Sequence, residues 1–378
     1  MSDRPYNIRA FKGHTLQLLQ AWIDGDTEGL KSLYGWALNS VATVVKDEDA
    51  HNDDDVPLTH SRSHHEWLVR HGLLPLFAAL LNTRKNATLD LEINKGTAEV
   101  WRNRRLSCIS RFTRLENVAN AMTGALDAWG GPWAIIKGFS LARRIYEQPS
   151  MRLTGDIDIL VAPQYLNDVL DVLYSIGGRK EPLTKKSHEE CVYIRGVFID
   201  LHLAPIRIGR MRFNPTSDWL SRTKRSGNYP YLSEHDELVL SFFHPAVTDY
   251  LTGRIVRILD IVLQVRRNRE PIDWHRLAED VCYLGLANAA YATAIYVNHL
   301  FPSKNGVVVP QHFIDSLKID RFRRHYWQFW LDRQPDRLFA ANPLIAQALF
   351  NLWLNDSPLD WVRAINDRRR TFRQSSSH

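Results

Sequence analysis

The stretch RLTGDIDILV, residues 152–161, decides the fold, because it places two aspartates two positions apart inside an apolar run. Successive side chains of a β-strand point to opposite faces, so Asp156 and Asp158 share one face while the alternate residues, from Ile157 to Val161, fill the core behind it. An unpaired carboxylate buried in such surroundings costs several kcal/mol. The run therefore predicts a strand that presents two charges to a site where something compensates them.

A second acidic strand follows in CVYIRGVFIDLHL, residues 191–203, which predicts a hairpin that turns at Arg195 and Gly196. On its second arm Asp200 and His202 share a face by the same alternation. If this arm lies beside the strand of residues 156–161, three carboxylates converge. Such a group repels itself at neutral pH unless a cation lies among its members.

A divalent metal is the natural compensation for three converging carboxylates. Mg²⁺ prefers hard oxygen ligands and shares its remaining positions with substrate phosphates. Carboxylates that project from two strands into an open cleft suit a two-metal phosphoryl-transfer site. We therefore expect Mg²⁺ or Mn²⁺ at Asp156, Asp158 and Asp200, with a nucleoside triphosphate (NTP) as the substrate.

A phosphate cradle is predicted directly ahead of the acidic strand, in IIKGFSLARRIY, residues 135–146. Gly138 stands at a strand-to-helix turn, where backbone N–H groups and a helix N-terminus can face an anion. Ser140 is placed to add a hydroxyl group, and Lys137 and Arg152 can add positive charge. A glycine at a strand end is common, so its position ahead of the two aspartates is what gives it weight.

Three regions follow one another along the chain, and no internal repeat is seen. Residues 1–130 predict helices by their apolar spacing, with an acidic linker near 46–57. Residues 131–225 predict a mixed α/β core in the order strand, helix, strand, helix, hairpin. Residues 226–378 return to helices and end in a basic tail. The sequence thus predicts an α/β core flanked by two helical regions.

Composition limits the class of protein only broadly. The chain has 378 residues and a formal net charge of +6, a small excess that favours an anionic partner. Its three cysteines are far apart and show no CxxC spacing, which favours neither a disulfide framework nor a zinc cluster. The N-terminus lacks the pattern of a signal peptide, and no apolar stretch approaches the roughly 18 residues of a membrane span. We expect a cytoplasmic protein without a membrane partner.

The segments KGFSLARRIY, RLTGDIDILV and VFIDLHLAP together resemble the nucleotidyltransferases of the DNA polymerase β superfamily. More narrowly, they resemble a largely uncharacterised bacterial nucleotidyltransferase family, and similar flanking segments extend the resemblance over roughly residues 60–300. The resemblance implies an α+β fold with a polymerase-β-like core. It implies an enzyme (EC 2.7.7-like) that transfers a nucleoside monophosphate (NMP) from an NTP to an acceptor hydroxyl and releases pyrophosphate.

By this resemblance, Asp156 and Asp158 would hold both metal ions, and Asp200 would complete the ion at the attacking hydroxyl. The remaining expected roles concern the triphosphate and the substrate. Gly138 and Ser140 would contact the triphosphate, Lys137 and Arg152 would balance its charge, and His202 would touch the substrate or orient Asp200.

Two departures from the superfamily pattern leave alternatives open. Phe139 stands where a glycine or serine commonly follows the glycine, and sixteen residues separate Phe139 from Asp156. Toxin-like nucleotidyltransferases that act on RNA have a similarly long spacer. A degenerate nucleotide-binding protein with a regulatory or scaffolding role is another alternative. The acceptor can be a small molecule, a peptide or protein, or an RNA.

Three further features carry less weight. The aromatic and basic residues of 320–337 are typical either of a nucleic-acid stacking surface or of a helix with core aromatics. The histidine cluster of 60–65 can bind metal or remain solvated. Asp260, within RILDIVLQ, is expected to brace the junction between the core and the C-terminal helices.

Overall fold

The computed structural model describes residues 8–26, 28–30, 66–81, 95–180, 189–268, 270–302, 307–333, 339, 342–360, 362–363 and 366. The acidic linker near 46–57, the histidine cluster of 60–65 and the basic tail beyond 366 lie outside these residues. The helices are α1 (Ile8–Asp24), α4 (Leu74–Leu80), α5 (Lys95–Trp129), α6 (Lys137–Ile145), α7 (Leu166–Ser175), α8 (Thr216–Ser221), α9 (Glu234–Asp249), α10 (Ile255–Arg267), α11 (Trp274–Tyr283), α12 (Ala287–Leu300), α13 (Gln311–Ser316), α14 (Arg321–Arg333) and α16 (Pro343–Leu354).

One mixed sheet forms the centre of the described chain, in the order β3-β4-β5-β2-β1-β7-β6. Its strands are β1 (Trp133–Ile136), β2 (Asp156–Val161), β3 (Arg179–Lys180), β4 (Glu189–Ile194), β5 (Val197–His202), β6 (Lys224–Ser226) and β7 (Tyr229–Tyr231). β2 pairs antiparallel with β1 and parallel with β5. The predicted acidic strand and its neighbour are therefore confirmed, and so is the α+β fold class.

The β4–β5 hairpin turns where its sequence predicts. Ile194 pairs with Val197, and the two residues between them have positive φ angles, 48° at Arg195 and 86° at Gly196. Two successive residues in this conformation form the tight turn whose twist matches that of the flanking strands. The turn fixes the register of β5 and with it the face on which Asp200 lies.

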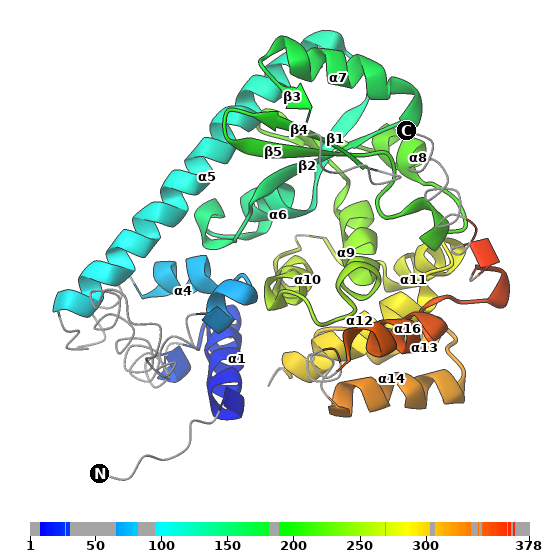
Figure 1. Cartoon of the computed structure of the whole chain (residues 1–378). Coiled ribbons are helices and arrows are strands. Elements are labelled where there is room, and N and C mark those ends of the chain that lie inside the picture. Colours follow the sequence, from blue (N-terminus) through cyan, green and yellow to red (C-terminus); the bar gives the residue numbers. More distant parts are fainter. Residues whose placement is uncertain are drawn as a thin grey trace.

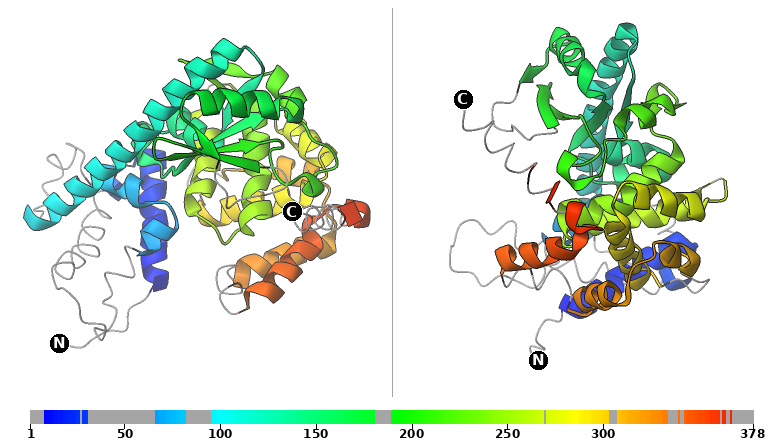
Figure 2. Two further views of the ribbon diagram at one scale, coloured as in Figure 1. Left: turned by 45° about the horizontal axis from the view of Figure 1, so that its top comes forward. Right: turned by 90° about the vertical axis from the view of Figure 1, so that its right-hand side faces the viewer.

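The helices α5 and α7 cover one face of the sheet (Figure 1). Buried residues of β2, among them Ile157 and Ile159, pack there against Met122 of α5 and Leu173 of α7. The further views keep this layer at one end of the molecule and the C-terminal helices at the other (Figure 2). Because strand side chains alternate, the aspartates of β2 point away from α5 and α7.

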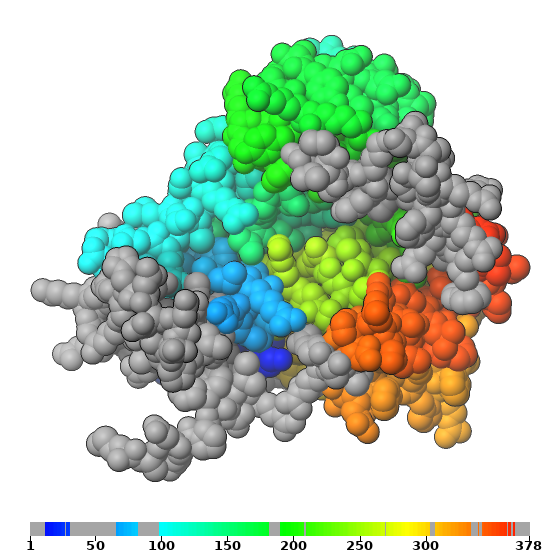
Figure 3. Space-filling view, viewed as in Figure 1, coloured from blue at the N-terminus to red at the C-terminus, as the bar shows by residue number. Residues whose placement is uncertain are grey.

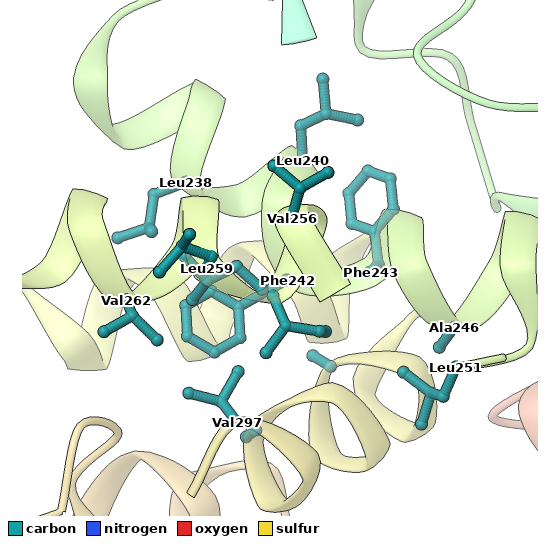
Figure 4. Packing of buried hydrophobic residues seen from close by; sticks show 14 of the residues in the cluster. Leu238, Leu240, Phe242, Phe243, Ala246, Leu251, Val256, Leu259, Val262 and Val297 are labelled. Carbon is teal, nitrogen blue, oxygen red and sulfur yellow. The ribbon is translucent and has the colours of Figure 1, made fainter. Parts of the chain in front are cut away.

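The opposite face of the sheet turns toward a bundle of C-terminal helices. Ala134, Ile136 and Leu160 of the sheet belong to the same buried cluster as α9, α10 and α12. Within that bundle Phe242 of α9 packs close to Val262 of α10 (Figure 4). In the space-filling view α9 and α10 lie between the sheet layer and the orange α16 (Figure 3). The carboxylate face is thus at the junction of the sheet and the bundle.

The N-terminal region joins the same bundle. Within residues 66–81 the helical backbone is interrupted at Gly72, where φ is 71° and an added Cβ would lie 2.8 Å from Cγ1 of Val256. The carbonyl of His71 accepts a hydrogen bond from the backbone N–H of Val256, at 3.1 Å.

The predicted domain boundaries near residues 130 and 225 stay a prediction. Among the helices that the structure describes, none combines the length and apolar composition that a membrane span requires.

The aromatic and basic stretch of 320–337 forms α14 over most of its length. Trp327 and Trp330 are buried, whereas Phe322 and Phe329 are exposed. The guanidinium of Arg333 lies over the ring of Phe329. The core interpretation is confirmed for the two tryptophans.

Candidate functional site

The three predicted carboxylates lie on one face of two adjacent strands. In the parallel pairing of β2 with β5, Asp158 is opposite Asp200 and Asp156 is opposite Phe198. On the other side of β2, Asp158 is opposite Ile136, the residue directly before the glycine turn. Side chains paired across parallel strands point to the same face. The register therefore brings the acidic group and the glycine turn to one edge of the sheet.

Asp158 is the most strongly compensated of the three. Its Oδ1 lies 2.7 Å from Nε2 of His202 and 3.8 Å from Nζ of Lys137. Burial alone would raise the pKa of Asp158, but the Lys137 ammonium and the His202 hydrogen bond outweigh it and lower the pKa to about 2. This carboxylate is ionised at neutral pH, as a cation ligand must be.

The negative charge of Asp156 is less well compensated by neighbouring positive groups. Burial, followed by the negative charges of Asp158 and Asp200, raises its pKa to about 6. In the part of the chain that the structure describes, no three carboxylate, imidazole or thiol groups come together as a complete metal site. Burial is the largest cause of the raised pKa of Asp156, and the positive charges of Lys137 and Arg152 do not offset burial and the two neighbouring carboxylates together. A hard cation among the three carboxylates fits that electrostatic need.

The glycine turn has its unusual backbone at Lys137 rather than at Gly138. Lys137 has φ 54°, a left-handed conformation that is strained for a residue with a side chain. Gly138 is closely packed: an added Cβ would lie 3.2 Å from Nη1 of Arg152 and 3.3 Å from Cγ2 of Thr154, so these side chains would have to shift slightly. The strained backbone places the Lys137 ammonium over the carboxylate face, 3.4 Å from Nε2 of His202.

A buried carboxylate on α9 holds the same turn. Glu237 accepts a hydrogen bond from the backbone N–H of Lys137 at 3.0 Å and another from the hydroxyl of Ser140 at 3.0 Å. Both Ser140 and Glu237 are almost completely buried. Burial raises the pKa of Glu237 although Arg144 and these two donors act against it. Ser140 thus faces α9 in this structure and not the open face of the sheet.

Arg152 lies behind the turn, and its guanidinium forms hydrogen bonds with other groups of the protein. Its Nη2 lies 2.7 Å from Oδ2 of Asp260, and its Nη1 donates to the carbonyl of Leu153 and to the hydroxyl of Thr154. Asp260 also accepts from the hydroxyl of Tyr146 at 2.9 Å. The predicted bracing role of Asp260 is confirmed, and Arg152 is its partner.

Sequence analysis did not identify three groups that lie at or near the site: Glu237, His244 and Arg257. The positive charge of Arg257, on α10, helps to lower the pKa of Asp158. Its Nη1 lies 3.4 Å from Nδ1 of His244 and forms an ion pair with Asp249. Burial, followed by the charges of Arg257 and Lys137, lowers the pKa of His244 well below its ordinary value. No local pattern in the sequence marks these residues, because each reaches the site from a helix of the bundle.

Comparisons with known proteins agree with the geometry at the level of a family. A family described as "uncharacterised nucleotidyltransferase" matches residues 63–302. No curated protein matches the chain.

Two solved structures of ANT(2″)-Ia are similar to part of the chain. The crystal structure in complex with adenylyl-2″-tobramycin is 14% identical, with a TM-score of 0.31, and the match covers 40% of this chain and 87% of that one. The solution structure, whose title describes an antibiotic-resistance factor with substrate-regulated conformation dynamics, is 13% identical, with a TM-score of 0.32 and coverage of 42% and 84%. Likeness at this level says nothing about the acceptor of this chain.

Proposed function

Because the chain belongs to the uncharacterised nucleotidyltransferase family, we propose that it transfers an NMP from an NTP to an acceptor hydroxyl and releases pyrophosphate. The observation that carries the proposal is the register of β2 and β5, which puts Asp158 opposite Asp200 with Asp156 on the same face. The glycine turn lies one strand away, at the end of β1. Carboxylates that can hold metal ions, beside a turn that can receive phosphates, are parts that phosphoryl transfer commonly uses.

We assign the role of metal ligands to Asp156, Asp158 and Asp200: the first two would hold both ions, and Asp200 would complete the ion at the acceptor hydroxyl. Mg²⁺ or Mn²⁺, when bound there, lowers the pKa of the acceptor hydroxyl and neutralises charge on the triphosphate. The oxygen-only donor set and the raised pKa of Asp156 support this assignment. His202 orients Asp158 through their hydrogen bond.

The proposed triphosphate site lies between the glycine turn and α10. Lys137 would bind a phosphate oxygen, because its ammonium already lies over the carboxylate face. Arg257 is the second candidate cation for the phosphates, since its charge reaches Asp158 from the bundle side. Gly138 lets the turn pack closely on Arg152 and Thr154. Ser140 and Arg152 then act by holding the turn in place, through Glu237 and Asp260.

Transfer of an α-³²P label tests the proposed function. Purified protein is incubated with each labelled NTP, Mg²⁺ or Mn²⁺, and separate RNA, protein and metabolite fractions. We expect label in one fraction, and loss of that label with Asp158→Asn. Asp171→Asn is the matched control, because Asp171 is exposed on α7, which covers the other face of the sheet.

Each other result has a definite meaning. Label transfer that survives Asp158→Asn would overturn the assigned role of that residue. If calorimetry detects metal-dependent NTP binding but no fraction is labelled, the protein is a regulatory nucleotide-binding protein and not an enzyme. Absence of both binding and transfer would overturn the proposed function.

A further inference from the structure

An exposed aromatic pair continues the carboxylate face of the sheet. Tyr193 of β4 is paired directly with Phe198 of β5, and their ring centroids are 5.0 Å apart. In the parallel register Phe198 is the neighbour of Asp156. The two rings are 39% and 43% exposed, although most large apolar side chains of the sheet are buried. The rings are therefore available to a ligand beside the carboxylates.

The aromatic pair lies on the far side of the carboxylates from the glycine turn. Neighbouring strands follow in the order β1, β2, β5, β4, so the turn and Tyr193 are separated by three strand spacings, about 14 Å. In phosphoryl transfer the attacking and leaving oxygens are roughly in line across the reacting phosphorus. A triphosphate held at the turn therefore leaves the β5 and β4 side for the acceptor.

Two arginines of α5 lie at the end of the sheet where β2 and β5 begin. An added Cβ at Gly155, the residue before Asp156, would lie 3.1 Å from Nη2 of Arg111. At Gly196, in the hairpin turn, an added Cβ would lie 3.8 Å from Cδ of Arg114 and from the hydroxyl oxygen of Tyr193. Both arginines are exposed, and neither forms an ion pair within the described residues. The long helix α5 runs past the β4–β5 hairpin (Figure 1).

We propose that Tyr193, Phe198, Arg111 and Arg114 form an acceptor subsite for an unpaired nucleobase and its neighbouring phosphates, at the end of a single-stranded nucleic acid. This inference rests on the proposed function and names the class of its acceptor. The nucleobase stacks on the aromatic pair, the guanidinium groups bind phosphate oxygens, and the terminal hydroxyl reaches toward Asp200. The oxygen of that hydroxyl forms the new bond to the α-phosphorus, and the bond from the α-phosphorus to pyrophosphate breaks. The hydroxyl proton passes to a carboxylate of the site or to water.

The residue chemistry favours a nucleic acid over the other acceptor classes. Planar bases stack on aromatic rings whatever their sequence, and arginines follow the backbone phosphates. A polycationic small molecule would be repelled by two arginines, and a peptide hydroxyl has no part that needs two flanking cations. Duplex ends hold their bases stacked within the helix, so a single strand is the better fit.

Binding of labelled oligonucleotides tests the subsite directly. Fluorescein-labelled 12-nucleotide single strands of RNA and of DNA, and a duplex of the same sequence, are titrated with the full chain in the absence of NTP. We expect single strands to bind more tightly than the duplex. Tyr193→Val/Phe198→Val, which keeps strand propensity but removes both rings, is expected to raise the Kd at least about fivefold.

The charge variant gives an independent readout. Arg111→Gln/Arg114→Gln is expected to reduce the slope of log K against log salt by about 1.4, which is two phosphate contacts on a single strand. Arg102→Gln is the matched control on the same helix. Arg102 lies nine residues, or two and a half helical turns, before Arg111 and is therefore on the opposite face of α5. Tyr174→Val on α7, 36% exposed, is the control for the aromatic pair.

The outcomes separate the subsite from the proposed function. Equal affinity of the wild type and both variants for single strands overturns the subsite. Transfer of NMP only to a small molecule or a protein overturns it as well, while the proposed function stands. Strand binding that depends on the aromatic pair, without transfer of NMP to any RNA, DNA, protein or metabolite fraction, sustains the binding surface and overturns the proposed function. If only RNA or only DNA receives the label, that result identifies the acceptor nucleic acid.

Discussion

Arg152 and Asp260 form a buried ion pair that joins the carboxylate sheet to the C-terminal bundle. Arg152 lies four residues before Asp156, and Asp260 lies on α10. Nε and Nη2 of the guanidinium both donate to the carboxylate, at distances from 2.7 to 3.1 Å. The pair fixes the start of β2 relative to the helix that also carries Arg257. Stability and site geometry are thus coupled at one contact.

Arg152→Met is expected to destabilise the fold by about 3–5 kcal/mol, because it leaves Asp260 as a buried charge without its main partner. Urea unfolding monitored by circular dichroism measures the change. Arg225→Met is the control: Arg225 pairs with Asp127 at the surface, with side chains 49% and 41% exposed, and such pairs contribute about 1 kcal/mol or less. Equal effects of the two substitutions would contradict the bracing role.

Glu237→Gln is expected to change stability in a pH-dependent way. Burial raises the pKa of Glu237 above its ordinary value of 4.5. A carboxyl group whose pKa is raised by folding contributes stability that is fully present below pH 4.5 and is lost as the pH rises through the folded pKa. Relative to wild type, Glu237→Gln should therefore be most unfavourable at low pH and less so at neutral pH.

Unfolding free energies of both proteins between pH 4 and pH 7.5 measure this trend. Glu279→Gln is the control, since the side chain of Glu279 is 66% exposed on α11. A difference between Glu237→Gln and wild type that does not change with pH would show that Glu237 has the same pKa in the folded and unfolded chains.

The sheet and its acidic face could be predicted because both depend on local patterns. Alternation in RLTGDIDILV assigns the face of each aspartate, and the Arg195–Gly196 turn fixes the register of Asp200. These signals lie within a few residues of the groups they position. The α+β class follows from the same patterns, with helical spacing before and after the core.

The partners of the glycine turn could not be predicted, because they are distant in sequence. Glu237 is 100 residues from Lys137, and Asp260 is 108 residues from Arg152. A buried acidic residue within a helix such as α9 looks, in sequence, like any polar position of its first turn. For this reason Ser140 and Arg152 were expected at the triphosphate, whereas the structure places each against a carboxylate of the bundle.

His202→Leu is expected to lower kcat about 10- to 100-fold without unfolding the protein. His202 is nearly buried, its Nε2 lies 2.7 Å from Oδ1 of Asp158, and groups that orient a metal ligand commonly have effects of this size. The metal concentration for half-maximal activity should rise as well, which a purely structural role would not cause. His275→Leu, at a side chain that is 76% exposed on α11, is the control. An unchanged metal requirement would show that His202 does not orient Asp158.

The left-handed backbone of Lys137 predicts an inverted order of stability between two substitutions. Both Lys137→Met and Lys137→Gly remove the ammonium near Asp158, but only glycine adopts φ 54° without strain. Lys137→Gly is therefore expected to be about 1 kcal/mol more stable than Lys137→Met. The controls are Asp171→Met and Asp171→Gly, at an exposed position within α7. There the glycine variant should be less stable than the methionine variant by a similar amount, because glycine is unfavourable in a helix. Urea unfolding of the four variants checks both differences. Both Lys137 variants should also bind NTP more weakly than wild type; the same order of stability at both positions would contradict the strained turn.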